Sequence, residues 1–227
     1  MRKWFYGFRM LLVPLFLGLV ILPAGAQGFF SKISWFAGGS ILFFPEDNGR
    51  HSGPMPVLPS PGLGFSYPIT DVLKFELSYD FYTTHYGYAL GRAVPVEVEH
   101  RTARVIGSLL GFHVARHFEV TPFMTVRAYG GPAVDLRIVF MAEDLTDGLD
   151  NISEVRKDVD SIRRYFWTKG RWLMPVIGGG VDFPLSAHFK IGLDLRIWIP
   201  MYRIWSGENL PGIEGWRFGL GIRFTIL

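Results

Sequence analysis

The feature that most constrains the fold of this chain is an alternation of side chains at its C-terminal end. From Trp216 to Ile226, the even-numbered positions are large and apolar, and the odd-numbered positions are polar or glycine. A period of two indicates a β-strand with one apolar face. The pattern recurs about eight times, near residues 30–44, 60–68, 72–86, 100–115, 120–139, 167–183, 188–204 and 212–226. The sequence therefore predicts an all-β fold.

The N-terminal segment departs from this pattern and is typical of a cleavable signal peptide. Basic residues at positions 2, 3 and 9 precede an apolar stretch from Met10 to Leu22, and Pro23-Ala24-Gly25-Ala26 follows. The stretch is shorter than the about 20 residues that a membrane-spanning helix needs. We expect the chain to be exported, residues 1–26 to be removed and residues 27–227 to form one domain.

Charge and cysteine content narrow the function classes. Removal of the segment takes away three of the 23 Lys and Arg residues and none of the 20 acidic residues, so the formal charge falls from +3 to zero. We therefore expect no nucleic-acid partner. The chain has no cysteine, so its stability must come from the hydrogen-bonded sheet rather than from disulfides. No metal-ligand spacing is present, and no cofactor is expected.

Strand length and the connections between strands favour a transmembrane barrel over a soluble β-sandwich. Most of the expected strands are longer than the about five or six residues of soluble sheets. Short links at 67–71, 116–120 and 184–188 alternate with long ones at 46–59, 87–99, 141–166 and 206–212. Bacterial outer-membrane barrels have short periplasmic turns and long extracellular loops. The sequence thus predicts an eight-stranded antiparallel transmembrane β-barrel.

The polar faces of these strands carry charges of both signs, interspersed with glycine. Facing lipid near the bilayer midplane, each Arg or Lys would cost roughly 2 to 4 kcal/mol, so these side chains should point into the lumen. We expect them to form a network that fills a barrel just wide enough for its own side chains. The expected network consists of Lys74, Glu76, Asp80, Arg127, Asp135, Arg137, Asp182, Lys190, Asp194, Arg196, Arg217 and Arg223.

Three segments carry a resemblance to a known group of proteins. They are Gly62–Tyr79, Pro122–Gly131 and Gly178–Arg196, each of which combines glycines, aromatic residues and a turn in the manner of a barrel hairpin. They resemble small outer-membrane barrels of the OmpA, OmpX and OmpW type. The resemblance implies a bacterial outer-membrane location, contact with outer-membrane lipid, and recognition of the C-terminal strand by the barrel-assembly machinery, here through Phe224 and Ile226.

The third long loop contains an amphipathic helical pattern. Apolar residues recur at steps of three and four, with charged residues on the remaining face. We expect a helix in this loop, which either packs its apolar stripe on the rim or acts as a lid over the barrel mouth. The stripe consists of Ile152, Val155, Val159, Ile162 and Phe166.

The sequence leaves three functions open. The first is a narrow barrel, either closed like OmpX and OmpA or, like OmpW, a passage for small hydrophobic solutes, with Phe36, Leu42 and Trp198 lining an apolar mouth. The second is a surface adhesin or ligand-binding barrel, which would bind a host or extracellular ligand through its loops. The third, less favoured, is a lipid-modifying enzyme. Ser108 and His113 lie five positions apart on one strand and so on opposite faces, which excludes a catalytic dyad; we therefore expect no enzymatic activity.

Overall fold

The computed structural model describes residues 32–44, 57–89, 91–96, 103–141, 152–207 and 215–227. The expected signal peptide, residues 1–26, lies outside these ranges. The strands are β1 (Ser34–Phe43), β2 (Leu58–Pro68), β3 (Leu73–Ala89), β4 (Arg92–Val96), β5 (Ala103–Thr121), β6 (Met124–Gly131), β7 (Ala133–Met141), β8 (Val176–Ser186), β9 (Phe189–Trp198) and β10 (Arg217–Ile226). The helices are α3 (Ile152–Trp167), the 3-10 turn η2 (Thr168–Gly170) and α4 (Met201–Ser206).

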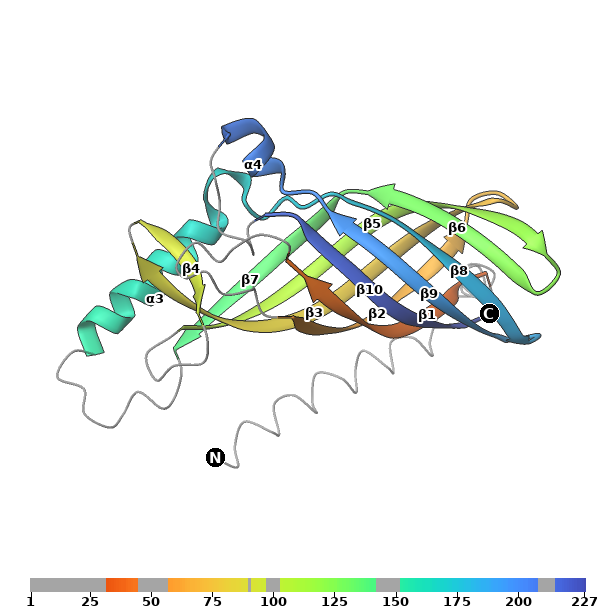
Figure 1. The fold of residues 1–227 in the computed structure, drawn as a ribbon, viewed down its shortest axis with the longest axis horizontal. Helices are drawn as coiled ribbons and strands as arrows, with labels where there is room; N and C mark the ends of the chain where they lie inside the picture. Colours follow the sequence, from red (N-terminus) through yellow and green to blue (C-terminus); the bar gives the residue numbers. More distant parts are fainter. Residues whose placement is uncertain (1–31, 45–56, 90, 97–102, 142–151, 208–214) are drawn as a thin grey trace, which may run out of the picture. The chain divides into compact units, whose positions relative to one another are not determined.

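The strands form one antiparallel sheet that closes on itself (Figure 1). Its order runs β3-β2-β1-β10-β9-β8-β6-β5, and β5 pairs back with β3. The strands β6 and β7 are two parts of one wall strand, because both pair with β5 and only Pro132 separates them. The strand β4 pairs with β3 alone, outside the ring. The barrel therefore has eight strands, which confirms the predicted fold class.

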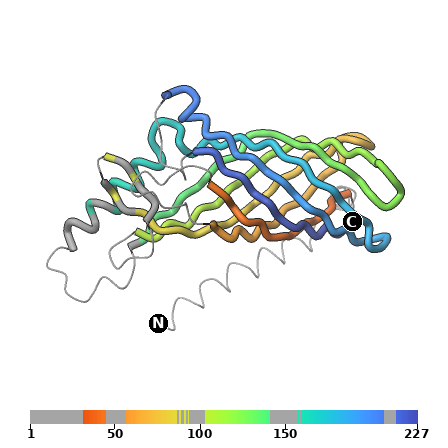
Figure 2. The backbone as a smooth tube through the Cα atoms, viewed as in Figure 1, coloured from red at the N-terminus to blue at the C-terminus, as the bar shows by residue number. Residues whose placement is uncertain are grey.

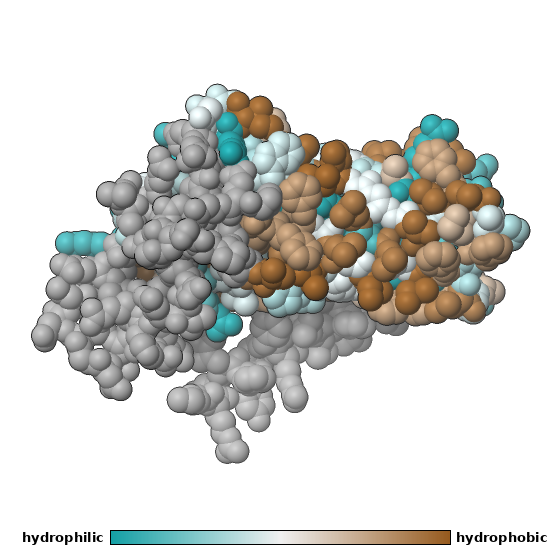
Figure 3. All heavy atoms as spheres, viewed as in Figure 1, coloured by the Kyte–Doolittle hydropathy of each residue, from teal (hydrophilic) through white to brown (hydrophobic). Residues whose placement is uncertain are grey.

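The barrel wall is apolar on its outer face. Outward side chains of β9 and β10 include Leu193, Leu195, Leu220 and Ile222, all exposed. Figure 3 shows hydrophobic side chains covering much of the wall. Aromatic residues cluster near the strand ends of the outer surface, where the rings of Trp35 and Phe65 lie 5.7 Å apart. A soluble protein would bury such residues, so this exterior fits a lipid environment.

The end with the short turns also holds both ends of the barrel chain. The first residues of β1 pair with the last residues of β10, and the Leu227 amide donates to the His188 carbonyl in the β8–β9 turn. One expected turn, at 116–120, is wrong. The alternation continues through Phe118 and Val120, which lets β5 run on to Thr121 and places the turn at Pro122 and Phe123.

The opposite, outer end is uneven in height. A tilted strand crosses a bilayer in about 9 to 11 residues, but β3 has 17 and β5 has 19. The wall strand also continues through β7, beyond the Gly131–Val176 pair at which the β6–β8 ladder ends. The outer parts of β3 and β5, together with β4 and β7, form a sheet beyond the barrel proper, which we call the extension sheet (Figures 1 and 2).

Helices replace two stretches that the alternation predicted to be strand. The strand expected at 167–183 begins only at Val176, after α3 and η2. The strand expected at 188–204 ends at Trp198, because Pro200 interrupts it and α4 follows. The helix α4 in turn ends at Gly207, which has the left-handed conformation with a φ of 66°. None of the helices in the described ranges is long and apolar enough to cross a membrane.

Inward glycines leave space for aromatic rings of the neighbouring strand. Tyr82 is paired with Gly107, and Tyr129 with Gly178. A Cβ atom added at either glycine would collide with the ring of its partner. The interior is therefore packed closely enough that the smallest residue is needed beside each ring.

Candidate functional site

The barrel interior holds the charged side chains in three groups. In the group nearest the end with the short turns, both terminal nitrogens of Arg223 donate to Glu76 at 2.9 Å. Arg127 lies 4.0 Å from the same carboxylate, and His117 lies 3.8 Å from it. The ring of Phe36 packs 3.7 Å below the Arg223 guanidinium. Glu76 thus accepts two hydrogen bonds from Arg223 and has two further basic side chains nearby on the lumen side of β3.

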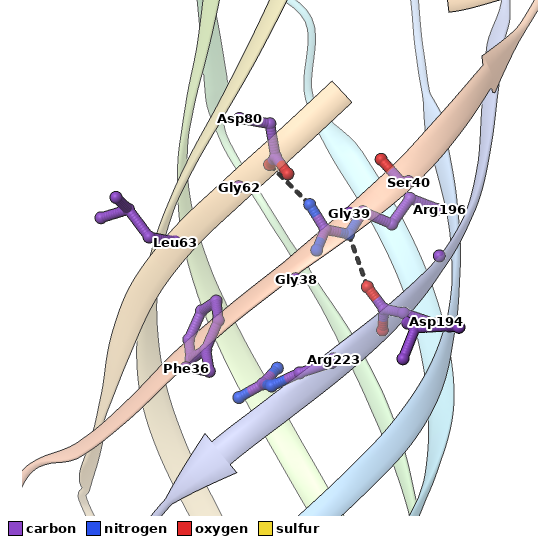
Figure 4. A pocket seen from close by; sticks show the side chains of 12 residues that line it. Phe36, Gly38, Gly39, Ser40, Gly62, Leu63, Asp80, Asp194, Arg196 and Arg223 are labelled. Carbon is purple, nitrogen blue, oxygen red and sulfur yellow. Dashed lines mark hydrogen bonds and ion pairs between the residues drawn. The ribbon is translucent and has the colours of Figure 1, made fainter. Parts of the chain in front are cut away.

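The middle group crosses the lumen. Arg127 donates to Asp182 and to Asp194, each at 2.8 Å. Arg196 donates to Asp194 and, with its other end, to Asp80, each at 2.5 Å. Because β9 and β3 are four strands apart in either direction around the ring, the Arg196–Asp80 pair joins opposite walls (Figure 4).

The outer group is centred on Asp135, which is buried. Its carboxylate accepts hydrogen bonds from Arg137 at 2.7 Å, from Arg217 at 2.6 Å and from the Tyr82 hydroxyl at 2.9 Å. Two guanidinium groups and a hydroxyl thus satisfy one carboxylate. A buried carboxylate needs such partners, since its desolvation would otherwise cost several kcal/mol.

Taken together, the paired charges of the three groups cancel. Among the described residues, eight ion pairs join five carboxylates to five arginines. Lys74 and Lys190, which the sequence also placed in the network, are half-buried and stand outside these pairs within the described residues. The structure therefore brings ten of the twelve expected side chains together: Glu76, Asp80, Arg127, Asp135, Arg137, Asp182, Asp194, Arg196, Arg217 and Arg223.

Sequence reasoning missed polar members of the network. The Tyr129 hydroxyl donates to Asp194 at 2.9 Å, and Tyr82 takes the same role at Asp135. Both have the inward parity of their strands, so the alternation could have identified them. They are easily overlooked among charged residues because most of a tyrosine side chain is an apolar ring, and only its hydroxyl reaches the carboxylate.

An apolar cluster closes the outer mouth of the lumen. Leu42 and Trp198, expected at the mouth, are both fully buried there, together with Tyr86 and Val105. Phe36 was also expected at the mouth, and this is wrong. It lies beside Arg223, because β1 starts at the end with the short turns and Phe36 is its third residue.

The helix α3 packs its apolar stripe into this cluster. Ile162 and Phe166 are buried, and Val159 packs against them. The side chains of Ile152 and Val155 lie outside the described set. The Phe166 ring meets the Tyr86 ring with centroids 4.8 Å apart and lies 4.4 Å from the Arg137 guanidinium. The opposite face, with Lys157, is exposed.

A small cavity lies among the charges of the middle group. It has a volume of about 10 Å³ and lies beside the Arg196–Asp80 pair (Figure 4), lined also by Gly38, Gly62 and Arg223. This volume suits a single water molecule rather than a solute. Its walls on β1 and β2 include Gly38, Gly39 and Gly62, which place the backbone close to the charged groups.

The residues considered for chemistry lie apart. Ser108 points outward, within hydrogen-bonding distance (3.0 Å) of the Tyr79 hydroxyl, whereas His113 is buried in the interior. Across the described ranges, no three His, Cys, Asp or Glu side chains are grouped as a metal site would require. The interior therefore presents paired charges rather than a recognisable set of reactive groups.

An apolar exterior around a filled, charged interior in a closed ring of eight strands defines the class: the protein has the fold of the small outer-membrane β-barrels. No family model matches the chain, and no curated protein does. Solved structures do. The outer membrane protein OprG from Pseudomonas aeruginosa matches with a TM-score of 0.50 and 10% identity, over 86% of this chain and 95% of that chain.

Two further solved structures match the chain with lower scores. Neisserial surface protein A (NspA) gives a TM-score of 0.46 and 12% identity, over 86% of this chain and 96% of its own. The N-terminal β-barrel domain of Pseudomonas aeruginosa OprF gives 0.44 and 14%, over 86% and 95%. At these identities the likeness is one of fold.

Proposed function

We propose that the protein is a bacterial outer-membrane barrel with a closed lumen. It binds an external partner through the extension sheet at its outer end and does not pass solutes. The observation that carries this proposal is the Arg196–Asp80 pair at 2.5 Å, which joins opposite walls of the barrel. Moving a solute past it would require separating two buried charges, each of which would lose its partner.

The packing at the outer mouth supports the same proposal. Leu42, Trp198 and Phe166 are buried in one cluster above the Asp135 group. An apolar pocket for hydrophobic solutes, as in the OmpW type, would leave Leu42 and Trp198 accessible from the mouth. The two side chains serve as filling instead.

The extension sheet is the part best suited to bind an external partner. On the outward face of β7, Ile138 is 56% exposed and Phe140 is 47% exposed. Past Asp135, whose amide donates to the Trp172 carbonyl, β7 has no strand neighbour on that edge among the described residues. A strand edge that no other strand pairs with, beside exposed apolar side chains, can accept a strand of another protein. We therefore favour an adhesin-like role over transport.

Conductance in planar bilayers tests the closed lumen. We expect the refolded protein to insert without discrete current steps. The double variant Asp80→Asn with Arg196→Gln, which removes the cross-lumen pair without changing the net charge, should conduct in small steps. The control is Arg104→Gln, an exposed arginine on the outer face of β5, which should stay silent. Discrete steps from the unaltered protein would overturn the proposal.

A further inference from the structure

A surface at the outer rim combines exposed aromatic and basic residues. The helix α4 supplies Ile204, which is 57% exposed, and Trp205, which is 54% exposed. Trp167, at the end of α3, is 46% exposed. Lys169 in η2 and Arg203 in α4 flank these side chains in the sequence. We call these five residues the rim patch.

The rim patch is held from behind by buried contacts. The Arg171 guanidinium lies between two rings, 4.0 Å from that of Tyr165 and 4.2 Å from that of Tyr202. This stacking ties α3 to α4. Trp205 packs against Gly170, where an added Cβ would lie 2.9 Å from the indole. The exposed side chains thus project from a fixed support rather than from a loose loop.

The length of β9 places the rim patch at the membrane surface. A tilted strand crosses the hydrocarbon layer in about 9 to 11 residues, and β9 has ten, with Phe189 at its periplasmic end. The helix α4 starts at Met201, three residues after β9 ends. It therefore lies where the hydrocarbon layer meets the outer headgroups, the depth at which tryptophan is enriched.

On this side of the barrel, the rim patch continues the lipid-facing wall. Below it lie the outward side chains of β8 and β9, among them Ile177 and Leu195, both exposed. A short helix with an apolar outer side, a buried inner residue and flanking cations has the character of an interfacial helix. Continuity with the lipid-facing wall makes a lipid the occupant that this surface fits.

We infer that the rim patch binds a phosphate-bearing, acylated lipid of the outer leaflet. Ile204, Trp205 and Trp167 would contact its acyl chains, and the cations of Lys169 and Arg203 would attract its phosphates. Each cation also has a partner within the chain, so the lipid phosphate would join an existing group of contacts. Cationic side chains near an anionic lipid surface contribute to binding additively.

Lipid binding to the refolded protein tests this inference. The probe is diphosphoryl lipid A in mixed detergent micelles, and native mass spectrometry measures the fraction of barrels that retain it; phosphatidylcholine is the comparison lipid. We expect Lys169→Gln with Arg203→Gln to weaken lipid A binding by about tenfold and to leave phosphatidylcholine binding unchanged. Ile204→Ser with Trp205→Ser should weaken the binding of both lipids.

Two controls separate the inference from a general effect of charge or folding. Arg104→Gln removes an exposed cation at the outer end of β5 and should leave lipid A binding unchanged. All substituted side chains are exposed except Arg203, which is half-buried, so each variant should keep the gel mobility of the folded barrel. The single variant Lys169→Gln replaces the double one if that mobility is lost. Equal binding of lipid A to the unaltered protein and to the charge variant would overturn the inference, as would an equal loss in Arg104→Gln.

Discussion

The guanidinium of Arg137 lies 4.4 Å from the centre of the Phe166 ring and at the same time donates to Asp135 at 2.7 Å. One side chain thus joins the loop helix above the mouth to the charge network below it. A cation over an aromatic face is stabilised by the ring quadrupole, more so where water is excluded. The apolar closure and the ionic filling are therefore coupled rather than independent.

From this coupling we predict that Phe166→Ala destabilises the barrel by about 3 to 5 kcal/mol, the usual cost of removing a buried phenylalanine. Urea unfolding, followed by the mobility difference between folded and unfolded protein, measures the change. Lys157→Ala, on the exposed face of the same helix, is the matched control and should shift stability by less than about 0.5 kcal/mol. An equal effect of the two changes would show that α3 is not anchored through Phe166.

Arg127 contacts three carboxylates, at Asp182, Asp194 and Glu76. Its replacement by methionine would leave these acids with fewer partners in a buried site, so we predict a loss of about 3 to 5 kcal/mol. The same urea titration applies, with Arg104→Met as the exposed control. Stability equal to that of the unaltered protein would mean that water enters the interior and solvates the acids.

The glycines beside the aromatic rings give a third prediction. Gly107→Ala places a methyl group against the Tyr82 ring, which must move away from Asp135, and we expect a cost of about 1 to 3 kcal/mol. Gly39→Ala is the control, since a Cβ there meets nothing within 4 Å. If both variants unfold at the same urea concentration, the ring has room that the structure does not show.

The fourth prediction concerns the extension sheet. We predict that Ile138→Ser with Phe140→Ser abolishes the attachment of cells that display the protein to serum-coated surfaces, and that barrel stability stays unchanged, because both side chains are exposed. Leu195→Ser, on the lipid-facing wall, serves as control for exposed apolar loss. Attachment that persists in the extension-sheet variant would remove this face as the binding surface.

Much of this architecture could be predicted from a period of two in the sequence. Parity assigns each residue to the inside or the outside, which is why Arg127, Asp194 and Arg217 could be placed in the lumen. Parity says nothing of pairing, since the partners depend on the stagger between strands. No local pattern links Arg196 to Asp80, which is 116 residues away.

The alternation also does not predict the height of a residue along the barrel axis. Phe36 has the correct inward parity but lies at the opposite end of the lumen from the expected mouth, and the direction of the first strand is the signal that could have placed it near the short turns. The alternation also predicts strand for the first residues of α4, because Ile197 and Ile199 continue the period of two up to Pro200. Alternation shows where a strand can form. Where the strand ends depends on residues such as proline, which interrupt its hydrogen bonding, and on the packing of the segment that follows.

The distribution of the network along the chain has a consequence for how the barrel assembles. Strands β1 to β5 contribute only the acids Glu76 and Asp80 to the eight ion pairs, and strands β6 to β10 contribute all five arginines and the other three acids. Counting these paired side chains alone, the first half-barrel holds two unbalanced negative charges and the second holds two unbalanced positive charges. Closure of the ring neutralises both at once, so a partly assembled wall would stay charged and hydrated until the last seam is joined.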